Sequence, residues 1–306
     1  MKSETDKLGP IRSALFVPGN RPDRVDKAVA TAADHIIIDL EDAVAISQKE
    51  ETRALVRDKI IAHKDRGVLV RVNGLETDFL KGDLEAVVVK ELGGLVLPKT
   101  ENSHQVGEIH GLLADFEKKQ RVQDGSTAII LLTESALGVQ NIFQISSAAA
   151  ELNREFLIAL GAADYALDMG IEITKGGAEL MYPRSRIAVA CRAAGIPPPL
   201  DTPFMIDLKD IDALKDDARR AKQMGFQGKL CIHPNQIEPC HAIFTPSGEE
   251  IEFARRVVDA FEAEEARGLV AIQVDGKFVD YPVVERSRRI LRLASRIAGM
   301  SIKGDV

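Results

Sequence analysis

Residues 35–42 read HIIIDLED, a run of three isoleucines that ends in three acids. A short apolar run of this kind is typical of a fully buried strand. The same design, an apolar run followed by polar residues, recurs along the chain. It alternates with longer segments of helical periodicity, such as residues 49–62 and 211–224. This alternation predicts repeated βα units.

Eight segments fit the strand pattern: Ser13–Val17, His35–Leu40, Val68–Val72, Gly94–Leu97, Ala128–Leu132, Phe156–Leu160, Thr202–Ile206 and Lys229–Ile232. A right-handed βα crossover that is repeated eight times closes the sheet, so we predict an α/β fold of the (β/α)8 TIM-barrel type. An open doubly wound sheet is the alternative. No glycine-rich phosphate-binding fingerprint follows the first strand, which counts against the dinucleotide-binding version of that sheet.

The predicted strands leave a long C-terminal remainder. We expect a polar tail over residues 1–10, the barrel over residues 11–245 and an extension over residues 246–306. Within the extension the pattern predicts a charged helix, a turn and a last helix, at Ser247–Arg267, Asp275–Gly276 and Pro282–Ala298. This C-terminal helical extension is a candidate lid or oligomer contact, on its own barrel or on a neighbouring subunit.

The composition limits the classes of protein to consider. A chain of 306 residues with 45% hydrophobic residues can bury the core of one large barrel. Its formal net charge of -7 gives no reason to expect nucleic acid or an anionic membrane as a partner. The three cysteines form no CxxC pair, so neither a disulfide framework nor a zinc site is indicated. The polar start and the lack of a long apolar segment predict a cytoplasmic protein with no membrane attachment.

Polar residues stand at nearly every predicted strand end, where barrel enzymes carry their catalytic groups. Glu134 and Asp164 follow adjacent strands. Two ionised carboxylates at one mouth repel each other unless a cation lies between them, and oxygen-only ligation favours Mg²⁺, with Mn²⁺ as a substitute. The alternative is that both are helix N-caps or solvated loop carboxylates.

Arg71 ends an apolar strand, where an unpaired cation is costly. One interpretation is a catalytic and substrate-binding guanidinium that grips a carboxylate or a developing oxyanion. The other is a salt bridge to Asp39, Glu41 or Asp42 that braces the barrel mouth. Both hold together if those acids orient the arginine.

Other strand ends are less specific. Pro18 and Gly19 could bring backbone N–H groups near an anion, or form a plain turn before a helix. Arg24, in that helix, could meet phosphates or solvate its face. His233 follows the last predicted strand, and we expect it to make structural hydrogen bonds or line the pocket rather than to bind metal, because no second histidine stands at a ligand spacing.

Taken together, the motifs resemble one family over residues 11–295. They are RSALFVPG at 12–19, IDLEDAV at 38–44, VRVNG at 70–74, LPK at 97–99, Glu134-Ser135, GAAD at 161–164, IHPNQI at 232–237 and DGKFVDYP at 275–282. The family is the citrate lyase β-subunit-like branch of the HpcH/HpaI aldolases, which includes malyl-CoA and citramalyl-CoA lyases.

This resemblance implies a Mg²⁺-dependent lyase that splits a 3-hydroxyacyl thioester into an acetyl thioester and a 2-oxo acid. By position, Glu134 and Asp164 match the metal ligands, and Arg71 matches the substrate-binding arginine. Asp280 matches a catalytic acid that family members contribute from a C-terminal lid to a neighbouring active site. The alternative for Asp280 is an exposed N-cap just before Pro282. A homo-oligomer, either a trimer or a hexamer, is also implied.

The resemblance leaves the thioester carrier and the outcome of the reaction open. Citrate lyase β-subunits act on a carrier-protein thioester, whereas stand-alone relatives use coenzyme A. The stretch from Ile232 and His233 to Gln236 looks closer to the stand-alone enzymes, so CoA is expected, with Pro18, Gly19, Ile232 and His233 as substrate-binding residues. Thioester hydrolysis on the same scaffold and a non-catalytic binding subunit are the competing hypotheses.

Overall fold

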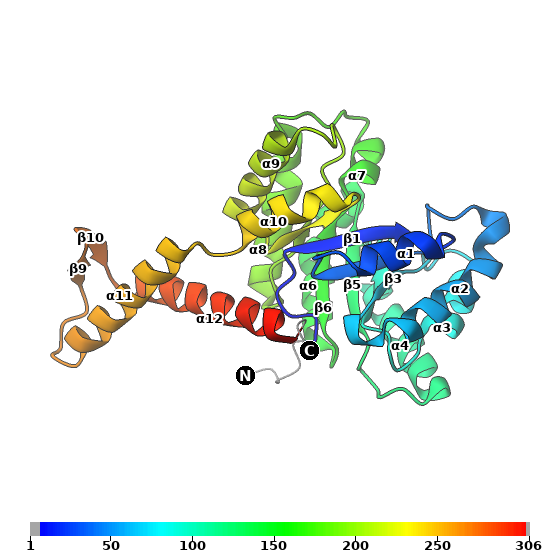
Figure 1. Ribbon diagram of the computed structural model, residues 1–306, viewed down its shortest axis with the longest axis horizontal. Coiled ribbons are helices and arrows are strands. Elements are labelled where there is room, and N and C mark those ends of the chain that lie inside the picture. Colours follow the sequence, from blue (N-terminus) through cyan, green and yellow to red (C-terminus); the bar gives the residue numbers. More distant parts are fainter. Residues whose placement is uncertain (1–6, 304–306) are drawn as a thin grey trace. The chain divides into compact units, whose positions relative to one another are not determined.

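The computed structural model describes residues 7–303, with side chains described as far as residue 299. Its strands form a closed, all-parallel barrel in chain order from β1 to β8, as the sequence predicted (Figure 1). The strands are β1 Ser13–Pro18, β2 His35–Asp39, β3 Leu69–Arg71, β4 Gly94–Leu97, β5 Ala128–Thr133, β6 Phe156–Leu160, β7 Leu200–Asp201 and β8 Gly228–Cys231. Pairing of Ser13 in β1 with Lys229 in β8 closes the barrel.

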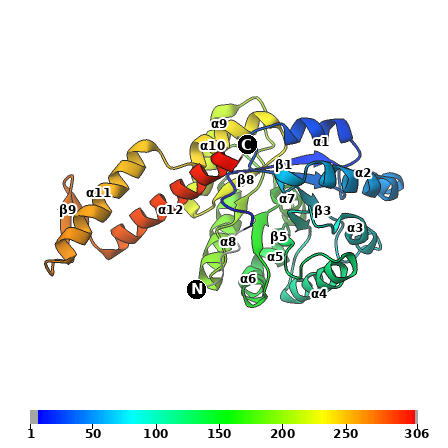
Figure 2. The same ribbon diagram turned by 60° about the horizontal axis from the view of Figure 1, so that its bottom comes forward.

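Helices return the chain between the strands and surround them, as Figure 2 shows for α3, α4, α6 and α8. They are α1 Pro22–Val29, α2 Lys49–Ala62, α3 Leu80–Val87, α4 Ser103–Gln120, α5 Ala136–Gln140, α6 Ile142–Glu151, α7 Ala162–Met169, α8 Met181–Ala194, α9 Ile211–Met224 and α10 Ile237–Phe244. Two predicted helices, residues 49–62 and 211–224, have the predicted bounds. The polar tail predicted over residues 1–10 lies partly outside the described residues.

The barrel interior is filled by aliphatic side chains from successive strands. Ile37, Leu69, Val96, Ile130 and Leu157 belong to one buried cluster, and each comes from a different strand. All five residues of β2 are buried, which is the burial pattern that its three isoleucines predict. This packed interior fixes the strand ends and so positions the residues that follow them.

The seventh strand was predicted wrongly. It is Leu200–Asp201 rather than Thr202–Ile206, and Leu200 pairs with Ala159 and Gly228. Pro203 has no N–H group to donate to a strand ladder, so the segment after Thr202 cannot continue the sheet. The three prolines at 197–199 hid the true strand, because they interrupt the apolar run before it.

A buried ionic cluster joins β7 and β8 to the helices outside them. Arg184 of α8 donates to Asp201 (Nε–Oδ1 2.9 Å) and to Asp217 of α9 (Nη2–Oδ1 2.8 Å). Lys229 of β8 donates to the same two carboxylates. Burial alone would raise the pKa of Asp217, but the charges of Lys229 and Arg184 lower it to about 2. This cluster, which we call the Lys229 cluster, replaces apolar packing at this edge of the barrel.

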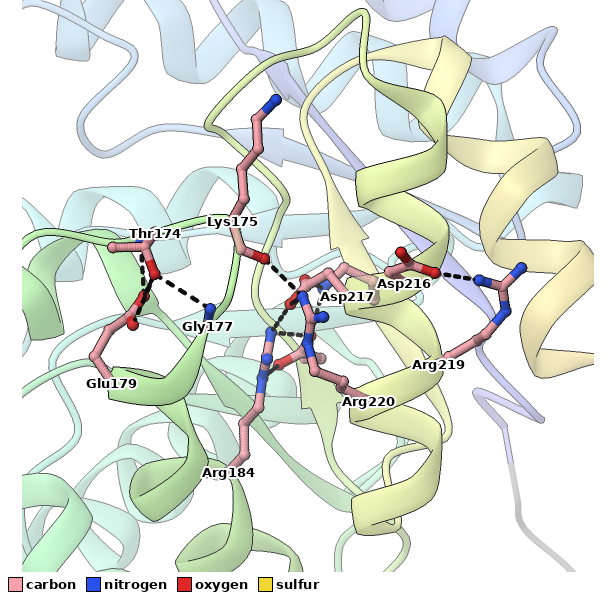
Figure 3. Close-up of polar contacts among 11 residues, drawn as sticks. Thr174, Lys175, Gly177, Glu179, Arg184, Asp216, Asp217, Arg219 and Arg220 are labelled. Carbon is pink, nitrogen blue, oxygen red and sulfur yellow. Dashed lines mark hydrogen bonds and ion pairs between the residues drawn. The ribbon is translucent and has the colours of Figure 1, made fainter.

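The loop that leads into α8 is tied to the same region (Figure 3). Arg220 of α9 donates to the Lys175 carbonyl at 2.9 Å, and Lys175 pairs with Asp210 at 2.6 Å. Glu179 accepts from the Thr174 amide at 2.6 Å. These contacts hold the loop between α7 and α8 onto α9.

The chain divides into two compact units between Ala242 and Ile243. The second unit contains α11 Gly248–Glu265, β9 Ile272–Val274, β10 Lys277–Val279 and α12 Tyr281–Lys303. Its own core comprises Val257, Phe261, Val274, Val279 and Val284. The predicted charged helix, the turn and the last helix are therefore confirmed as elements. No helix within residues 7–303 is both long and apolar enough to cross a membrane.

Candidate active site

A cavity of about 440 Å³ opens at the carboxyl ends of the barrel strands. The sequence-predicted site residues that line it are Pro18, Asp39, Asp42, Arg71, Glu134, Asp164 and Ile232. They come from β1, β2 and β3 and from the segments that follow β2, β5, β6 and β8. Gly19, Glu41 and His233 do not line it, and Asp280 belongs to the second unit.

Arg71 is held by two acids at the end of the neighbouring strand β2, Asp39 within the strand and Glu41 just after it. Its Nε and Nη2 donate to the two oxygens of Asp39 at 2.8 and 2.6 Å, and its Nη1 lies 2.9 Å from Glu41 Oε2. Burial opposes the charge of Arg71, but its hydrogen bonds to Asp39 and the nearby acids raise its pKa above the ordinary value. The guanidinium also lies over the Phe16 ring, 5.1 Å from the centroid. The predicted salt bridge to Asp39 and Glu41 is therefore present.

These contacts leave part of Arg71 available to a ligand. A guanidinium has five N–H groups. Two of them, on Nε and Nη2, hydrogen-bond Asp39, Nη1 forms ion pairs with Glu41 and Asp42, and Arg71 lines the cavity. Asp39 also accepts from the amides of Glu41 and Ala43, so the anchor of the arginine is itself fixed. The geometry suits a pre-oriented guanidinium at the mouth.

Glu134 follows β5 and is 3% exposed. Its Oε1 accepts a hydrogen bond of 2.8 Å from the Lys99 amide. Burial and the nearby charge of Asp164 raise the pKa of Glu134 to about 8, although the hydrogen bond from the Lys99 amide lowers it in part. Gly161 makes room for it, since a Cβ there would lie 2.5 Å from Glu134 Oε2.

Asp164 lies in the first turn of α7 and lines the cavity. The N-cap of α7 is Gly161, and the N-cap of α5 is Ser135, whose side chain accepts from the Gly138 amide. Neither Glu134 nor Asp164 therefore caps a helix, and the capping interpretation does not hold. The buried Thr202 hydroxyl accepts from the Ala162 amide at 3.0 Å, which anchors the start of α7.

The donor set around the cavity fits a hard divalent cation. Carboxylates outnumber cationic groups here; the acids are Asp39, Glu41, Asp42, Glu134 and Asp164, and the cations are Arg24, Arg71 and Lys99. Within the described part of the chain no three His, Cys, Asp or Glu side chains converge as a metal cage. Mg²⁺ is commonly held by one or two carboxylates and completes its shell with water and substrate, so a pair of acids is enough.

Three predicted substrate-binding residues have other contacts. The Gly19 amide donates to the Asp39 carbonyl at 2.9 Å, so it continues the strand pairing instead of meeting an anion. The plain-turn interpretation of this motif therefore fits better. His233 is exposed and accepts from the Asn235 amide at 3.2 Å, as a structural hydrogen-bonding residue. Ile232 donates its amide to Gln236 Oε1 and contributes its side chain to the cavity.

Asp280 precedes α12 in the second unit. Its Oδ1 accepts from the Val283 amide at 3.3 Å, so the helix-cap interpretation describes its contact in this chain. It is partly buried.

Lys99 contributes to the site although no role was predicted for it from the sequence, and Arg24 lies where it could meet a phosphate. Lys99 adopts a left-handed backbone (φ 52°), which lets its amide reach Glu134 while its Nζ lies 2.9 Å from Glu41 Oε1. A non-glycine residue in this conformation is uncommon and often marks a constrained site. Arg24 lines the cavity from α1. The LPK motif was visible in the sequence, but the left-handed backbone at Lys99 was not.

Comparison with known proteins decides the family. The family model described as HpcH/HpaI aldolase/citrate lyase matches residues 12–234. The chain belongs to this family. It is therefore an enzyme of the carbon–carbon lyase class, similar to both citrate lyase β-subunits and malyl-CoA lyases. The resemblance stated from the motifs is confirmed.

Among the relatives of this chain, the citrate lyase subunit beta of Leuconostoc mesenteroides is 38% identical to it, over 93% of each chain. The L-malyl-CoA/beta-methylmalyl-CoA lyase of Cereibacter sphaeroides is 32% identical, over 94% of this chain and 96% of that protein. A crystal structure of the protein CitE from Mycobacterium tuberculosis, in complex with magnesium, acetoacetate and coenzyme A, is 32% identical. It has a TM-score of 0.74 and covers 94% of this chain and 99% of its own.

Proposed function

We propose that this lyase uses Mg²⁺ to split a 3-hydroxyacyl-CoA thioester, such as malyl-CoA or citramalyl-CoA, into acetyl-CoA and a 2-oxo acid. The observation that carries the proposal is the shared cavity of Glu134, Asp164 and Arg71. Two carboxylates beside a fixed guanidinium can bind a cation and an anionic substrate together.

Glu134 and Asp164 are the residues that would hold the metal, with water and the 2-oxo acid portion as the other ligands. A bound Mg²⁺ supplies Lewis-acid polarisation of the oxygen that becomes the carbonyl. Relatives from Mycobacterium tuberculosis were crystallised with magnesium and oxaloacetate, and with magnesium and pyruvate, which supports this ligand class. Mn²⁺ has similar ligand preferences and should substitute.

The protein's own side chains and backbone amides act on the C3 oxygen and on the carboxylate of the substrate. As the C2–C3 bond breaks, its electron pair passes to the thioester fragment as an enolate, and the C3 hydroxyl gives its proton to a water molecule and becomes the carbonyl. Arg71 stabilises the negative charge that develops on that oxygen, because its free N–H groups are fixed by Asp39 before the reaction. The Ala162 amide donates to Thr202, but the next amides of the first turn of α7, those of Ala163 and Asp164, lack partners within their helix and favour an anionic carboxylate nearby.

A proton must then reach the enolate carbon to give the acetyl thioester. We assign this step to Asp280 of a neighbouring subunit in a homo-oligomer, a trimer or hexamer, as the family resemblance implies. In this proposal the second unit acts as a lid that also excludes water. The assignment to a neighbour, the oligomer and a cytoplasmic location remain predictions.

Coenzyme A is the proposed carrier. Arg24 lines the cavity and makes no side-chain contact within the described chain, so it is available to a CoA phosphate. The coenzyme A in the complex of the Mycobacterium tuberculosis relative supports the same class of ligand.

A second candidate is a citrate lyase β-subunit that acts on a carrier-protein thioester within a complex. Its support is the 38% identity to a citrate lyase subunit beta, compared with 32% to the malyl-CoA lyase. The two candidates share the bond cleavage and differ in the carrier.

Product analysis on a panel of malyl-, citramalyl- and citryl-CoA, with and without Mg²⁺, tests the proposal. Acetyl-CoA with glyoxylate, pyruvate or oxaloacetate, formed only with the metal, is the expected result. Free CoA with malate would show thioester hydrolysis instead. Turnover of citryl-carrier protein but of none of the CoA esters would favour the second candidate. If calorimetry detects no 2-oxo acid binding at all, the chain is a non-catalytic subunit and the proposal is wrong.

A further inference from the structure

A second cavity, of about 360 Å³, lies at the opposite end of the barrel. Its lining includes His35, the first residue of β2, and Gly67 and Gly93, which come shortly before β3 and β4. Because these residues stand where strands begin, the cavity lies away from the mouth that holds Arg71 and Glu134. The first unit alone forms it.

The charged residues that line this cavity are all cationic. Lys7, Lys90 and Arg121 come from three separate segments, and no Asp or Glu is among the described lining residues. In a chain with a net charge of -7 such a grouping is unexpected. Lys7 Nζ donates to the Ser126 carbonyl at 2.7 Å, whereas the side chains of Lys90 and Arg121 make no hydrogen bond or ion pair with the described residues. Two cations are thus available to an anion.

A buried histidine in the same lining lacks a hydrogen bond at one of its two ring nitrogens. His35 is 8% exposed, and its Nε2 lies 2.8 Å from the Leu8 carbonyl, which can only accept, so Nε2 carries the proton. Burial lowers the pKa of His35, which keeps the ring neutral, and Nδ1 is then a bare acceptor with no partner. The nearby Gly67 carbonyl cannot supply a proton. A buried acceptor of this kind costs free energy until a donor reaches it.

We propose that this second cavity binds a phosphate group, either inorganic phosphate or a small phosphate monoester. The anionic oxygens would pair with Lys90 and Arg121, and the P–OH group of the monoprotonated ion would donate to His35 Nδ1. A carboxylate offers negative charge but no such donor, so phosphate fits the three groups better. This proposal does not depend on the lyase reaction.

Calorimetric titration of the full-length, metal-free protein with inorganic phosphate tests the site, with acetate as the comparison anion. We expect phosphate to bind and acetate to bind at least about tenfold more weakly, because it lacks the donor. The double variant Lys90→Gln/Arg121→Gln should weaken phosphate binding by about tenfold or more. The matched control, Lys81→Gln/Lys118→Gln, removes the same charge from exposed positions of α3 and α4 and should leave binding unchanged.

The variant Arg24→Gln distinguishes phosphate binding at the second cavity from phosphate binding at the catalytic mouth. It should leave phosphate affinity at the second cavity unchanged. The proposal is overturned if the wild-type protein binds no phosphate at millimolar concentration, or if the Lys90/Arg121 variant binds it as well as the wild type. Equal losses in both double variants would show a general charge effect, and loss in Arg24→Gln alone would place binding at the mouth. Acetate bound as tightly as phosphate would contradict the role of His35.

Discussion

Arg71 combines a structural and a functional requirement in one side chain. Lysine keeps the charge but has no planar fork, so it cannot pair with Asp39 and still present fixed donors to the cavity. We expect Arg71→Lys to lower kcat/KM by about 100-fold to 1000-fold, the usual effect of removing a charge-stabilising donor. Acetyl-CoA formation would be measured, with Arg57→Lys on α2 as the control. Near-wild-type turnover of Arg71→Lys would rule out the proposed role.

Gly161 is needed for space rather than for an unusual backbone. An added Cβ would lie 2.5 Å from Glu134 Oε2 and 2.7 Å from Glu134 Cβ. We expect Gly161→Ala to displace the carboxylate and weaken Mg²⁺ binding by about tenfold or more, a loss of roughly 1.4 kcal/mol or greater. Gly107→Ala, in open space on α4, is the control and should bind Mg²⁺ normally. Unchanged affinity in Gly161→Ala would argue against Glu134 as a ligand.

Single residues differ in how far the sequence predicts them. Glu134, Asp164 and Arg71 follow or end strands of a recognisable pattern, so their convergence on one mouth could be foreseen. Lys99 could not, because its contribution depends on a left-handed backbone and an amide hydrogen bond. Gly19 was expected to offer its amide to a ligand, but the strand pairing with Asp39 uses it. Backbone hydrogen bonding of this kind depends on neighbours distant in sequence.

Among the elements, the barrel strands were predictable where an apolar run stands alone. Seven of the eight agree closely with prediction, because β-branched runs between helical segments have few other interpretations. The exception is β7, whose two residues lie between prolines and Thr202. Its Asp201 belongs to a buried ionic cluster, so the usual apolar signal of a barrel strand is missing there.

The Lys229 cluster gives this region its stability. Lys229 is fully buried and contacts both Asp201 and Asp217, so Lys229→Met would leave two buried carboxylates balanced only by Arg184 and by Arg220, whose Nη2 lies 3.5 Å from Asp217 Oδ1. We expect a loss of about 3–5 kcal/mol in the free energy of unfolding, measured by urea denaturation. The control is Lys215→Met on α9, because Lys215 Nζ lies 3.8 Å from Asp212 Oδ1 in a solvent-exposed ion pair. This variant should change the free energy of unfolding by less than about 0.5 kcal/mol.

The same cluster predicts an acid dependence of stability. The folded-state pKa of Asp217, about 2, lies below its ordinary value of 3.8. The ion pairs of Asp217 therefore stabilise the fold fully above the ordinary pKa, and this contribution is lost as pH falls from about 4 to about 2. In urea denaturation, the stability difference between wild type and Asp217→Asn should be largest near neutral pH and shrink over that window. A difference that stays constant down to pH 2 would contradict the lowered pKa.

For the chain as a whole, the sequence predicted the barrel and a separate C-terminal extension. The periodicity could not predict how that extension is used, because an amphipathic helix pair has the same pattern wherever it packs. The second unit has its own core around Val257 and Phe261, and α11 and α12 pack together within it. A unit with its own core is compatible with a role in the active site of another subunit.

Subunit mixing decides whether Asp280 acts on a neighbouring barrel. Asp280→Asn and Arg71→Lys each disable every site in a uniform oligomer under this proposal. In oligomers co-expressed from both variants, a site with an intact Arg71 can meet an intact Asp280 from the other variant. Random assembly should restore roughly a quarter of the sites over all oligomers, and about one site in three in the mixed trimers. Activity of two-tag-purified mixed oligomers would be compared with each variant alone. If each site used its own chain's Asp280, no mixture would contain an intact pair, and activity no higher than that of the single variants would exclude a shared site.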